Sequence, residues 1–286
     1  MKNLVLMTFI VAPLAMADPF QPKNIPAESQ WYLHGDLTGL RKTNTGGFLL
    51  DQIRKGEADT IIDIETLFGF DLLEDLTDIT LFGTGKADEI AITLSGEFAR
   101  AQLEEVIVQA EGYNSTTYGT TKIHSWKDND RTQHAGFHDN NTVIISQKKG
   151  LLKLALDVLA GKTPGLKADL TPPSEEPVVV AYANIQKIKI PLDEGSHIIR
   201  KADSILRTLA EKQTRLAANL VIKTGSENMA KRMMHALAGL VSLSELADKN
   251  IEGLDILHNG QTSGKIMTMT MSLPAANAFA LISKLK

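Results

Sequence analysis

Histidine and aspartate residues recur in this sequence at spacings that suit a divalent metal. His34 and Asp36 are two residues apart, and His134 and His138 are four apart. On a β-strand, such spacings place both side chains on one face. Imidazole nitrogens and carboxylate oxygens are common ligands of zinc and similar ions. The four residues are therefore the candidate metal site of a metal-assisted hydrolase. The alternative is that the histidines are ordinary residues on exposed hairpins and bind no metal.

The familiar motifs of other catalytic and cofactor sites are missing. There is no cysteine, which excludes thiol nucleophiles, thiolate metal sites and disulfides. There is also no G-x-S-x-G nucleophile motif. The Gly-Thr-Gly-Lys sequence at 83–86 lacks the first glycine and the Ser or Thr of a phosphate-binding loop, and we interpret it as a hairpin turn. The sequence thus identifies no catalytic and no cofactor-binding residue; the cofactor is unknown, with a divalent metal as the one candidate.

A basic, methionine-rich helix is the second candidate site. The segment 229–247 has amphipathic spacing, with Lys231 and Arg232 beside several Met and Leu residues. Such a helix can bind a membrane surface or an adaptable partner groove. The alternative, that its apolar side packs in the protein core, is the commoner use of this pattern. If the two basic residues do bind a partner, we expect an envelope or extracellular protein.

An acidic run lies between residues 57 and 78, with eight acids and no Lys or Arg. We expect Asp71, Glu74, Asp75 and Asp78 to share one face of a helix. Carboxylates in this number could collect calcium, but the run lacks the alternating pattern of a calcium-binding loop. A solvated helix face is the simpler interpretation.

The first seventeen residues have the organisation of a secretory signal peptide. Lys2 gives the positive charge, 4–14 the apolar region, and Ala15-Met16-Ala17 the cleavage site. We therefore expect cleavage after Ala17 and a secreted bacterial protein, either periplasmic or extracellular. A lipid anchor at the cleavage point would need a cysteine, and no later stretch is apolar for long enough to be a transmembrane segment.

The formal net charge of −4 conceals an asymmetry along the chain. Residues 18–176 carry 15 Lys and Arg against 25 Asp and Glu, whereas residues 177–286 carry 14 against 9. The two halves could attract each other, or could simply have different solvated surfaces. The net acidity and the small aromatic content, 5%, argue against nucleic-acid binding.

The organisation of the chain centres on a proline-rich linker at 162–177. We expect a loose arm at 18–30, a first α+β unit at 31–161 and a second at 178–286. Hydrophobic periodicity predicts strands at 31–40, 79–83, 89–94, 116–126, 132–139, 142–146, 178–183, 215–223, 253–258 and 265–272. It predicts helices at 47–53, 60–68, 98–110, 151–159, 198–209, 229–247 and 274–285.

The two units follow a similar order of elements, which suggests an internal duplication. Segments 89–110 and 219–240 both read as strand, glycine turn and helix, and segments 142–161 and 266–285 both read as strand, short turn and helix. We therefore predict an α+β fold of two tandem repeats, each of the order strand, helix, strand(s), helix, strands, helix. Helices would cover a largely antiparallel sheet. One continuous sheet shared by both halves is equally compatible with this order.

A family resemblance covers residues 78–166. The stretch TQHAGFHDNNTVIISQKKGLLKLALDVLAGKTPGL, with the earlier DITLFG and ITLSGEF, resembles a group of secreted, internally duplicated bacterial proteins of unknown function. The resemblance implies export and a duplicated fold, and it implies no activity. Together these patterns favour a non-enzymatic binding or protein-interaction module of unknown ligand, with the metal-assisted hydrolase as the alternative.

Overall fold

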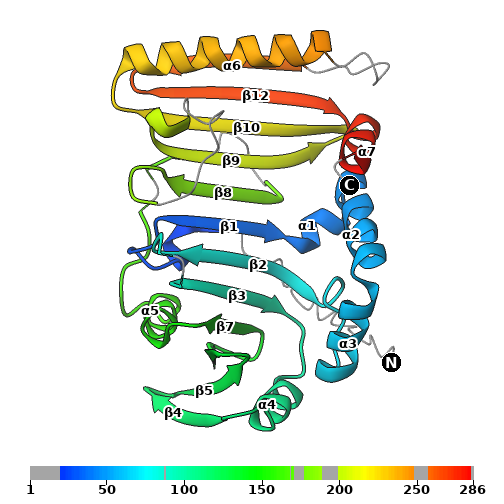
Figure 1. Cartoon of the computed structure of the whole chain (residues 1–286), viewed down its shortest axis with the longest axis vertical. Helices are drawn as coiled ribbons and strands as arrows, with labels where there is room; N and C mark the ends of the chain where they lie inside the picture. Colours follow the sequence, from blue (N-terminus) through cyan, green and yellow to red (C-terminus); the bar gives the residue numbers. More distant parts are fainter. Residues whose placement is uncertain are drawn as a thin grey trace, which may run out of the picture.

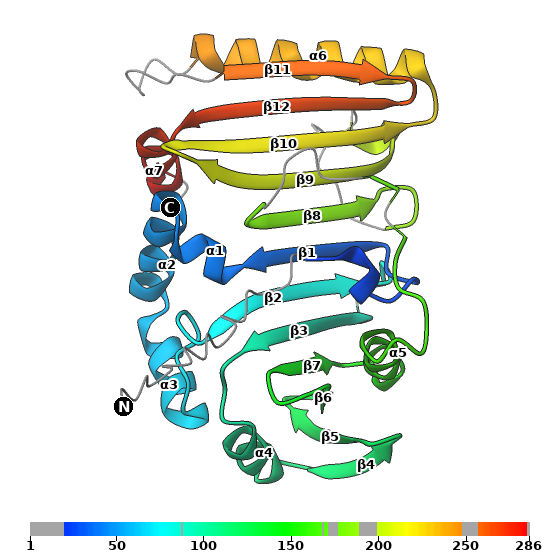
Figure 2. The same cartoon turned by 180° about the vertical axis from the view of Figure 1, so that it is seen from behind.

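The fold is built on one antiparallel sheet that runs through both halves of the chain (Figures 1 and 2). The computed structural model describes residues 20–86, 88–167, 169–170, 177–188, 199–247 and 257–284. Within them lie twelve strands in the order β11-β12-β10-β9-β8-β1-β2-β3-β7-β6-β5-β4, together with seven α-helices. The chain is therefore an α+β protein with a single large sheet.

The first half supplies seven strands and five helices. The strands are β1 (Trp31–Asp36), β2 (Leu76–Gly83), β3 (Ile90–Gly96), β4 (Asn114–Tyr118), β5 (Thr121–Asp128), β6 (Arg131–Phe137) and β7 (Thr142–Ser146). The helices are α1 (Leu37–Arg41), α2 (Asn44–Gly56), α3 (Ala58–Phe68), α4 (Arg100–Val108) and α5 (Lys149–Leu159), preceded by the 3-10 turn η1 (Pro22–Asn24). β7 pairs with β3, so the last strand of this half lies beside β3 although α4 and β4–β6 come between them in the sequence.

The second half is joined to the first where β8 (Val179–Asn184) pairs with β1. Its other elements are η3 (Ile199–Lys201), β9 (Ala202–Lys212), β10 (Arg215–Thr224), α6 (Glu227–Ala247), β11 (Leu257–Ser263), β12 (Ile266–Pro274) and α7 (Ala275–Lys284). As in the first half, the last strand lies beside the strand that precedes the helix: β12 pairs with β10, although α6 and β11 come between them in the sequence.

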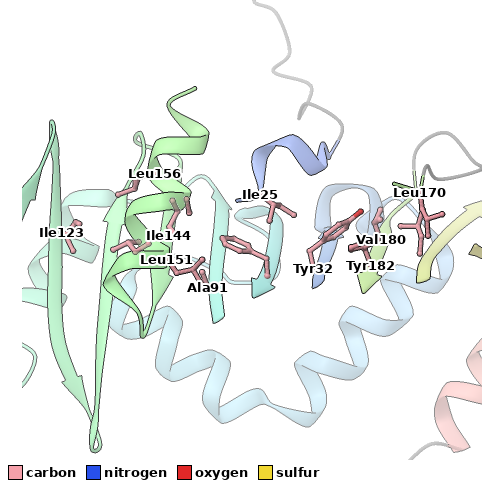
Figure 3. Close-up of a cluster of buried hydrophobic side chains, with 14 of the residues drawn as sticks. Ile25, Tyr32, Ala91, Ile123, Ile144, Leu151, Leu156, Leu170, Val180 and Tyr182 are labelled. Carbon is pink, nitrogen blue, oxygen red and sulfur yellow. The ribbon is translucent and has the colours of Figure 1, made fainter. Parts of the chain in front are cut away.

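The two faces of the sheet are covered by different helices. The first face, which we call face A, carries Tyr32, Phe82, Tyr182 and Leu206 in one row of paired residues. Face A packs against α5, η1 and Leu170 (Figure 3). Leu170 belongs to the proline-rich linker at 162–177, which we call the connector. The opposite face, face B, is covered by α4 at the β5–β7 end and by α6 at the β10–β12 end.

Face B is less covered between these two helices. Leu33, in the middle of the sheet, is 41% exposed. Helices α2 and α3 run along one end of the strands, between α7 and α4 (Figure 1). The rings of Phe48 in α2 and Phe279 in α7 stack at 4.6 Å, which ties the two ends of the described chain together.

Several predicted elements are confirmed by the structure. The strands at 178–183 and 215–223 form as β8 and β10, and the helix at 151–159 forms as α5. Gly161 has a φ of 69°, the left-handed conformation that commonly ends a helix. Ser226 accepts a hydrogen bond from the Met229 N–H and caps α6, as expected.

The helix predicted at 198–209 is wrong, because most of this segment forms strand β9. Ser204, Leu206, Thr208 and Ala210 are buried, and they face the opposite side from Ile205 and Leu209. Apolar residues thus lie on both faces while two of the buried residues are polar, so the hydrophobic alternation that marks a strand is lost in the sequence. The strand predicted at 116–126 is instead the hairpin of β4 and β5, since Gly119 turns the chain at a φ of 60°.

The acidic run does not form one helical face. Asp71, Glu74 and Asp75 lie in the turn between α3 and β2, and Asp78 lies within β2. Asp71 accepts hydrogen bonds from the backbone of Leu73 and Glu74 and from Arg54, at distances of 2.8 to 3.1 Å for the closest contact of each. Asp71 therefore caps the turn, which is a structural role.

Residues 20–30, within the segment expected as a loose arm, pack against the sheet. Ile25 is 1% exposed and accepts a hydrogen bond from the backbone N–H of Leu166 in the connector. The arm and the connector thus pack against each other over face A. The expected signal peptide at 1–17, residues 171–176 of the linker and residues 253–256 of a predicted strand lie outside the described residues.

None of the described helices combines the length and the apolar character needed to cross a membrane.

Candidate ligand-binding cavity

A cavity of about 300 Å³ lies on face B between α6 and the sheet. The described residues that line it come from η3, β9, β10, β12 and α6: Ile199, Ile205, Arg207, Ala218, Asn219, Leu220, Ile222, Met233, Leu237 and Met271. Eight of these ten side chains are apolar. Ligand sites are typically concave, mainly apolar and about 300 to 1,000 Å³ in volume, so this cavity is at the small end of that range.

The floor of the cavity is set by strand alternation. Ile205 and Arg207 on β9, and Ala218, Leu220 and Ile222 on β10, are each two residues apart and therefore point to the same face. The pairing of Ile222 with Ile205 and of Leu220 with Arg207 brings the two sets side by side. Between them, Asn219 directs its amide to the other face, where it bonds with Thr208 and Thr270.

The roof of the cavity is α6, whose position follows from its own sequence. Ser226 caps the first turn, and Glu227 pairs with Lys231 at 2.7 Å on the solvent side. Met233 and Leu237 are four residues apart, so they lie on one side of the helix and face the sheet. Met233 is 2% exposed and packs against β10 and β12. The methionine-rich side of α6 is thus a packing surface, and it also lines the cavity.

The cavity can hold an apolar group, with one polar anchor at its wall. Arg207 is the only charged residue among the described residues that line it. Ile199 in η3 also contributes to the lining and is 37% exposed, so the cavity meets solvent on the η3 side. Methionine and branched aliphatic side chains adapt to varied apolar shapes. This arrangement is suited to binding and offers no nucleophile or general base.

The predicted metal ligands are not brought together. His34 and Asp36 lie on β1, and His134 lies on β6, with three strands between them. Four strand spacings correspond to about 19 Å along the sheet. Asp36 accepts a hydrogen bond from the backbone N–H of Gly39 at 2.7 Å and caps α1. No cluster of three His, Asp or Glu residues suited to a metal occurs among the residues described above.

The two histidines of the β6 hairpin also point to different surroundings. His134 lies on face A, and its Nδ1 is 2.8 Å from Ser125 Oγ on β5. His138 lies beyond the end of β6 and is exposed. The alternation that would place residues four apart on one face therefore stops before His138. His34 is buried against Thr80 and stacks on the ring of Phe20 at 4.2 Å.

The predicted partner-binding pair lies on the solvent side of α6. Lys231 is paired with Glu227, and Arg232 is exposed. Neither residue lines the cavity.

A partly exposed polar network on face A was not predicted from the sequence. The carboxylate of Asp169 accepts hydrogen bonds from Ser204 and Lys223, both at 3.1 Å, and from the hydroxyl of Tyr182. Burial, followed by the charge of Asp169, raises the pKa of Tyr182 to about 12. The network fixes the connector to β8, β9 and β10. A lone aspartate in a proline-rich stretch gives no signal of this role.

The fold resembles that of TP0453 in two crystal forms. Crystal form III gives a TM-score of 0.51 with 13% identity, covering 94% of this chain and 99% of the TP0453 chain. Crystal form I gives a TM-score of 0.50 with 14% identity, covering 94% and 98% of the two chains. No protein-family model and no curated protein matches this sequence. At these identities the likeness to TP0453 shows the fold alone.

Proposed function

We propose that this protein is an exported, non-enzymatic binding module whose ligand occupies the cavity beneath α6. The observation that carries the proposal is the apolar cavity of about 300 Å³, whose described lining combines aliphatic and methionine side chains with one charged residue. Export is supported by the signal-like sequence of residues 1–17. A periplasmic or extracellular location follows from it.

The internal duplication is part of this proposal. In each half, a three-stranded meander is followed by a helix, and the last strand of the half pairs with the third: β7 with β3, and β12 with β10. The first strands of the two halves, β1 and β8, are antiparallel neighbours at the centre of the sheet. This matched strand order supports two tandem repeats related by a local two-fold axis.

The halves differ in what their crossover helices leave open. In the second half, α6 stands over the cavity, whereas in the first half α4 packs Leu103 against a cluster of Phe70, Phe98 and Phe137. A duplicated fold of this kind would keep one copy as a filled core and use the other for binding. The hydrolase alternative lacks an assembled site, because its four residues lie on separated strands.

The test is saturable binding of a neutral, environment-sensitive apolar dye, N-phenylnaphthylamine, to the chain from residue 18 onwards. We expect one site per chain in a fluorescence titration. Ala218→Met would fill part of the cavity floor and weaken the dye affinity at least tenfold, whereas Ala101→Met, on the exposed surface of α4, would leave it unchanged. Thermal melts of both variants verify folding. Unsaturable binding, or equal affinity in the two variants, would contradict the proposal.

Native mass spectrometry of the same chain gives an independent view. A stoichiometric small molecule retained from the host would support the binding function directly. A mass that is instead explained by a divalent ion, and is lost in His134→Ala, would transfer support to the metal-assisted hydrolase.

A further inference from the structure

Arg207 is an exposed cation at the margin of the cavity. On β9 it is paired with Leu220 of β10 on one side and Ala181 of β8 on the other. The next residue across the sheet is Leu33, so the row on either side of Arg207 is apolar. Its charge therefore lies where an otherwise apolar lining meets solvent.

No protein group described in the structure neutralises this charge. Among the described residues, Arg207 forms neither an ion pair nor a hydrogen bond. The two acids of the same strand, Asp203 and Glu211, are each four residues from Arg207, about 13 Å along the strand. Glu211 is also engaged with the backbone N–H groups of Asn44 and Thr45. An anion brought by a ligand would thus meet a guanidinium that has no competing partner in the described part of the chain.

We infer that the cavity binds a single-chain amphiphile, with its hydrocarbon chain under α6 and an anionic head group at Arg207. This rests on the proposed binding function and specifies its ligand class. The guanidinium fork matches carboxylate and phosphate oxygens, whereas the apolar lining matches an unbranched chain. A volume of about 300 Å³ is small for a ligand site and favours one chain over two.

The experiment is displacement of N-phenylnaphthylamine from the chain beginning at residue 18 by ligands that share one hydrocarbon chain. Decanoate and decyl phosphate carry anionic heads, decanol a neutral head and decyltrimethylammonium a cationic head. We expect the anionic ligands to bind about tenfold more tightly than decanol, and the cationic ligand to bind most weakly, since a charge-assisted hydrogen bond at a partly exposed site adds about that factor. The ratio of the decanoate affinity to the decyl phosphate affinity shows whether the site prefers a carboxylate or a phosphate head group.

Variants of two arginines assign the effect to one charge. Arg207→Gln should abolish the preference for anionic heads while decanol still binds, and Arg207→Lys should retain part of the preference. Arg232→Gln removes the same charge from the solvent side of α6 and should retain the full preference. If Arg207→Gln and Arg232→Gln behave alike, or if decanol and decanoate bind equally to the unaltered chain, the head-group inference is overturned while the cavity function stands. If no ligand displaces the dye, the cavity function itself fails.

Discussion

The carboxylate of Glu211, near the end of β9, accepts a hydrogen bond of 2.8 Å from the backbone N–H of Thr45, in the first turn of α2. The N–H of Asn44 donates to the same carboxylate at 3.1 Å. Thr43 caps the next N–H, that of Gly46. A side chain from the second half of the sequence thus completes the N-terminal cap of a helix from the first half, where a negative charge also opposes the helix dipole.

Removing this cap should destabilise the protein in a pH-dependent way. Burial alone would raise the pKa of Glu211, but the hydrogen bonds from Thr45 and Asn44 hold its pKa below the usual value. A carboxyl with a lowered pKa in the folded state stabilises above its unfolded pKa, and this contribution is lost as the pH falls through the folded pKa. We expect Glu211→Ala to lower the free energy of unfolding by about 1 to 2 kcal/mol at neutral pH, a typical capping value.

Urea denaturation at neutral and acidic pH measures this effect. Glu211→Gln keeps an acceptor without the charge, so its loss should be smaller than that of Glu211→Ala and nearly independent of pH. If the difference in free energy of unfolding between the wild type and Glu211→Gln stays constant down to low pH, the charge of Glu211 does not contribute to the cap.

Tyr182 should make the protein sensitive to alkali. Its pKa, about 12, is above the usual value of about 10 for tyrosine, because burial and then Asp169 disfavour the phenolate. The unfolded chain therefore loses this proton first as the pH rises. Stability from the neutral hydroxyl is complete below about pH 10 and is lost between about pH 10 and 12. We expect urea midpoints of the wild type to fall more steeply in this window than those of Tyr182→Phe.

Tyr32 provides a check on that result. Burial raises its pKa as well, followed by the charges of Tyr182 and Asp169. Tyr32→Phe should therefore flatten the alkaline loss too. If the wild type, Tyr182→Phe and Tyr32→Phe all lose stability with the same slope, neither buried hydroxyl controls alkaline stability.

His124 should contribute to acid sensitivity at the other end of the sheet. It is fully buried under α4, its Nε2 has no hydrogen-bond partner, and its Nδ1 is 3.3 Å from the Tyr113 hydroxyl. Burial lowers its pKa, so the unfolded state takes up the proton first and stability falls as the pH drops below about 6.5.

Replacing His124 by Phe should reduce the slope of stability against pH below about pH 6.5. His138→Gln, at an exposed position, is the control substitution of a histidine. His34 and His134 also have pKa values lowered by burial, so some slope should persist in His124→Phe. A slope identical to that of the wild type would show that His124 does not titrate on unfolding.

Gln213 is a site where a single change should stabilise the protein. It is the first residue of the loop between β9 and β10 and has a φ of 59°, a conformation that L-residues with a Cβ adopt at a cost. Positive φ at the first position is the pattern of a type II′ turn, which favours glycine there. We expect Gln213→Gly to raise the free energy of unfolding by about 0.5 to 1 kcal/mol.

The matched control for Gln213 is Asn129, at the equivalent position between β5 and β6, with a φ of 52°. Asparagine tolerates this conformation better than glutamine, so Asn129→Gly should change stability less. Thermal or urea unfolding of the two variants in parallel decides the point. A larger gain at Asn129 would contradict the strain assigned to Gln213.

The sequence alone was enough to predict the elements whose signals are local. α5 has a clear apolar stripe and a glycine at its end, and β10 follows the alternation of a strand with one helix-covered face. The cap of α6 by Ser226 is equally local. Each of these depends on residues within a few positions of one another, so their patterns survive in the linear sequence.

What could not be predicted depends on distant contacts. β9 has Leu206 and Ala210 on one face and Ile205 and Leu209 on the other, with polar residues on both faces, so its apolar residues do not alternate along the sequence. The metal hypothesis assumed that β1 and β6 would meet, which the strand order prevents. The cavity residue Arg207 is one arginine among many in the sequence, and only its register beside Leu220 distinguishes it.

The place of β1 in the sheet also has a consequence for how the chain reaches its native state. β1 pairs with β2 on one side and with β8 on the other. Ala183 of β8, which pairs with Trp31 of β1, is synthesised about 150 residues after Trp31. Until then β1 has an open edge with apolar side chains, which invites pairing between incomplete chains. We therefore expect slow folding that completes only after β8 has been made, and we expect fragments ending before β8 to aggregate.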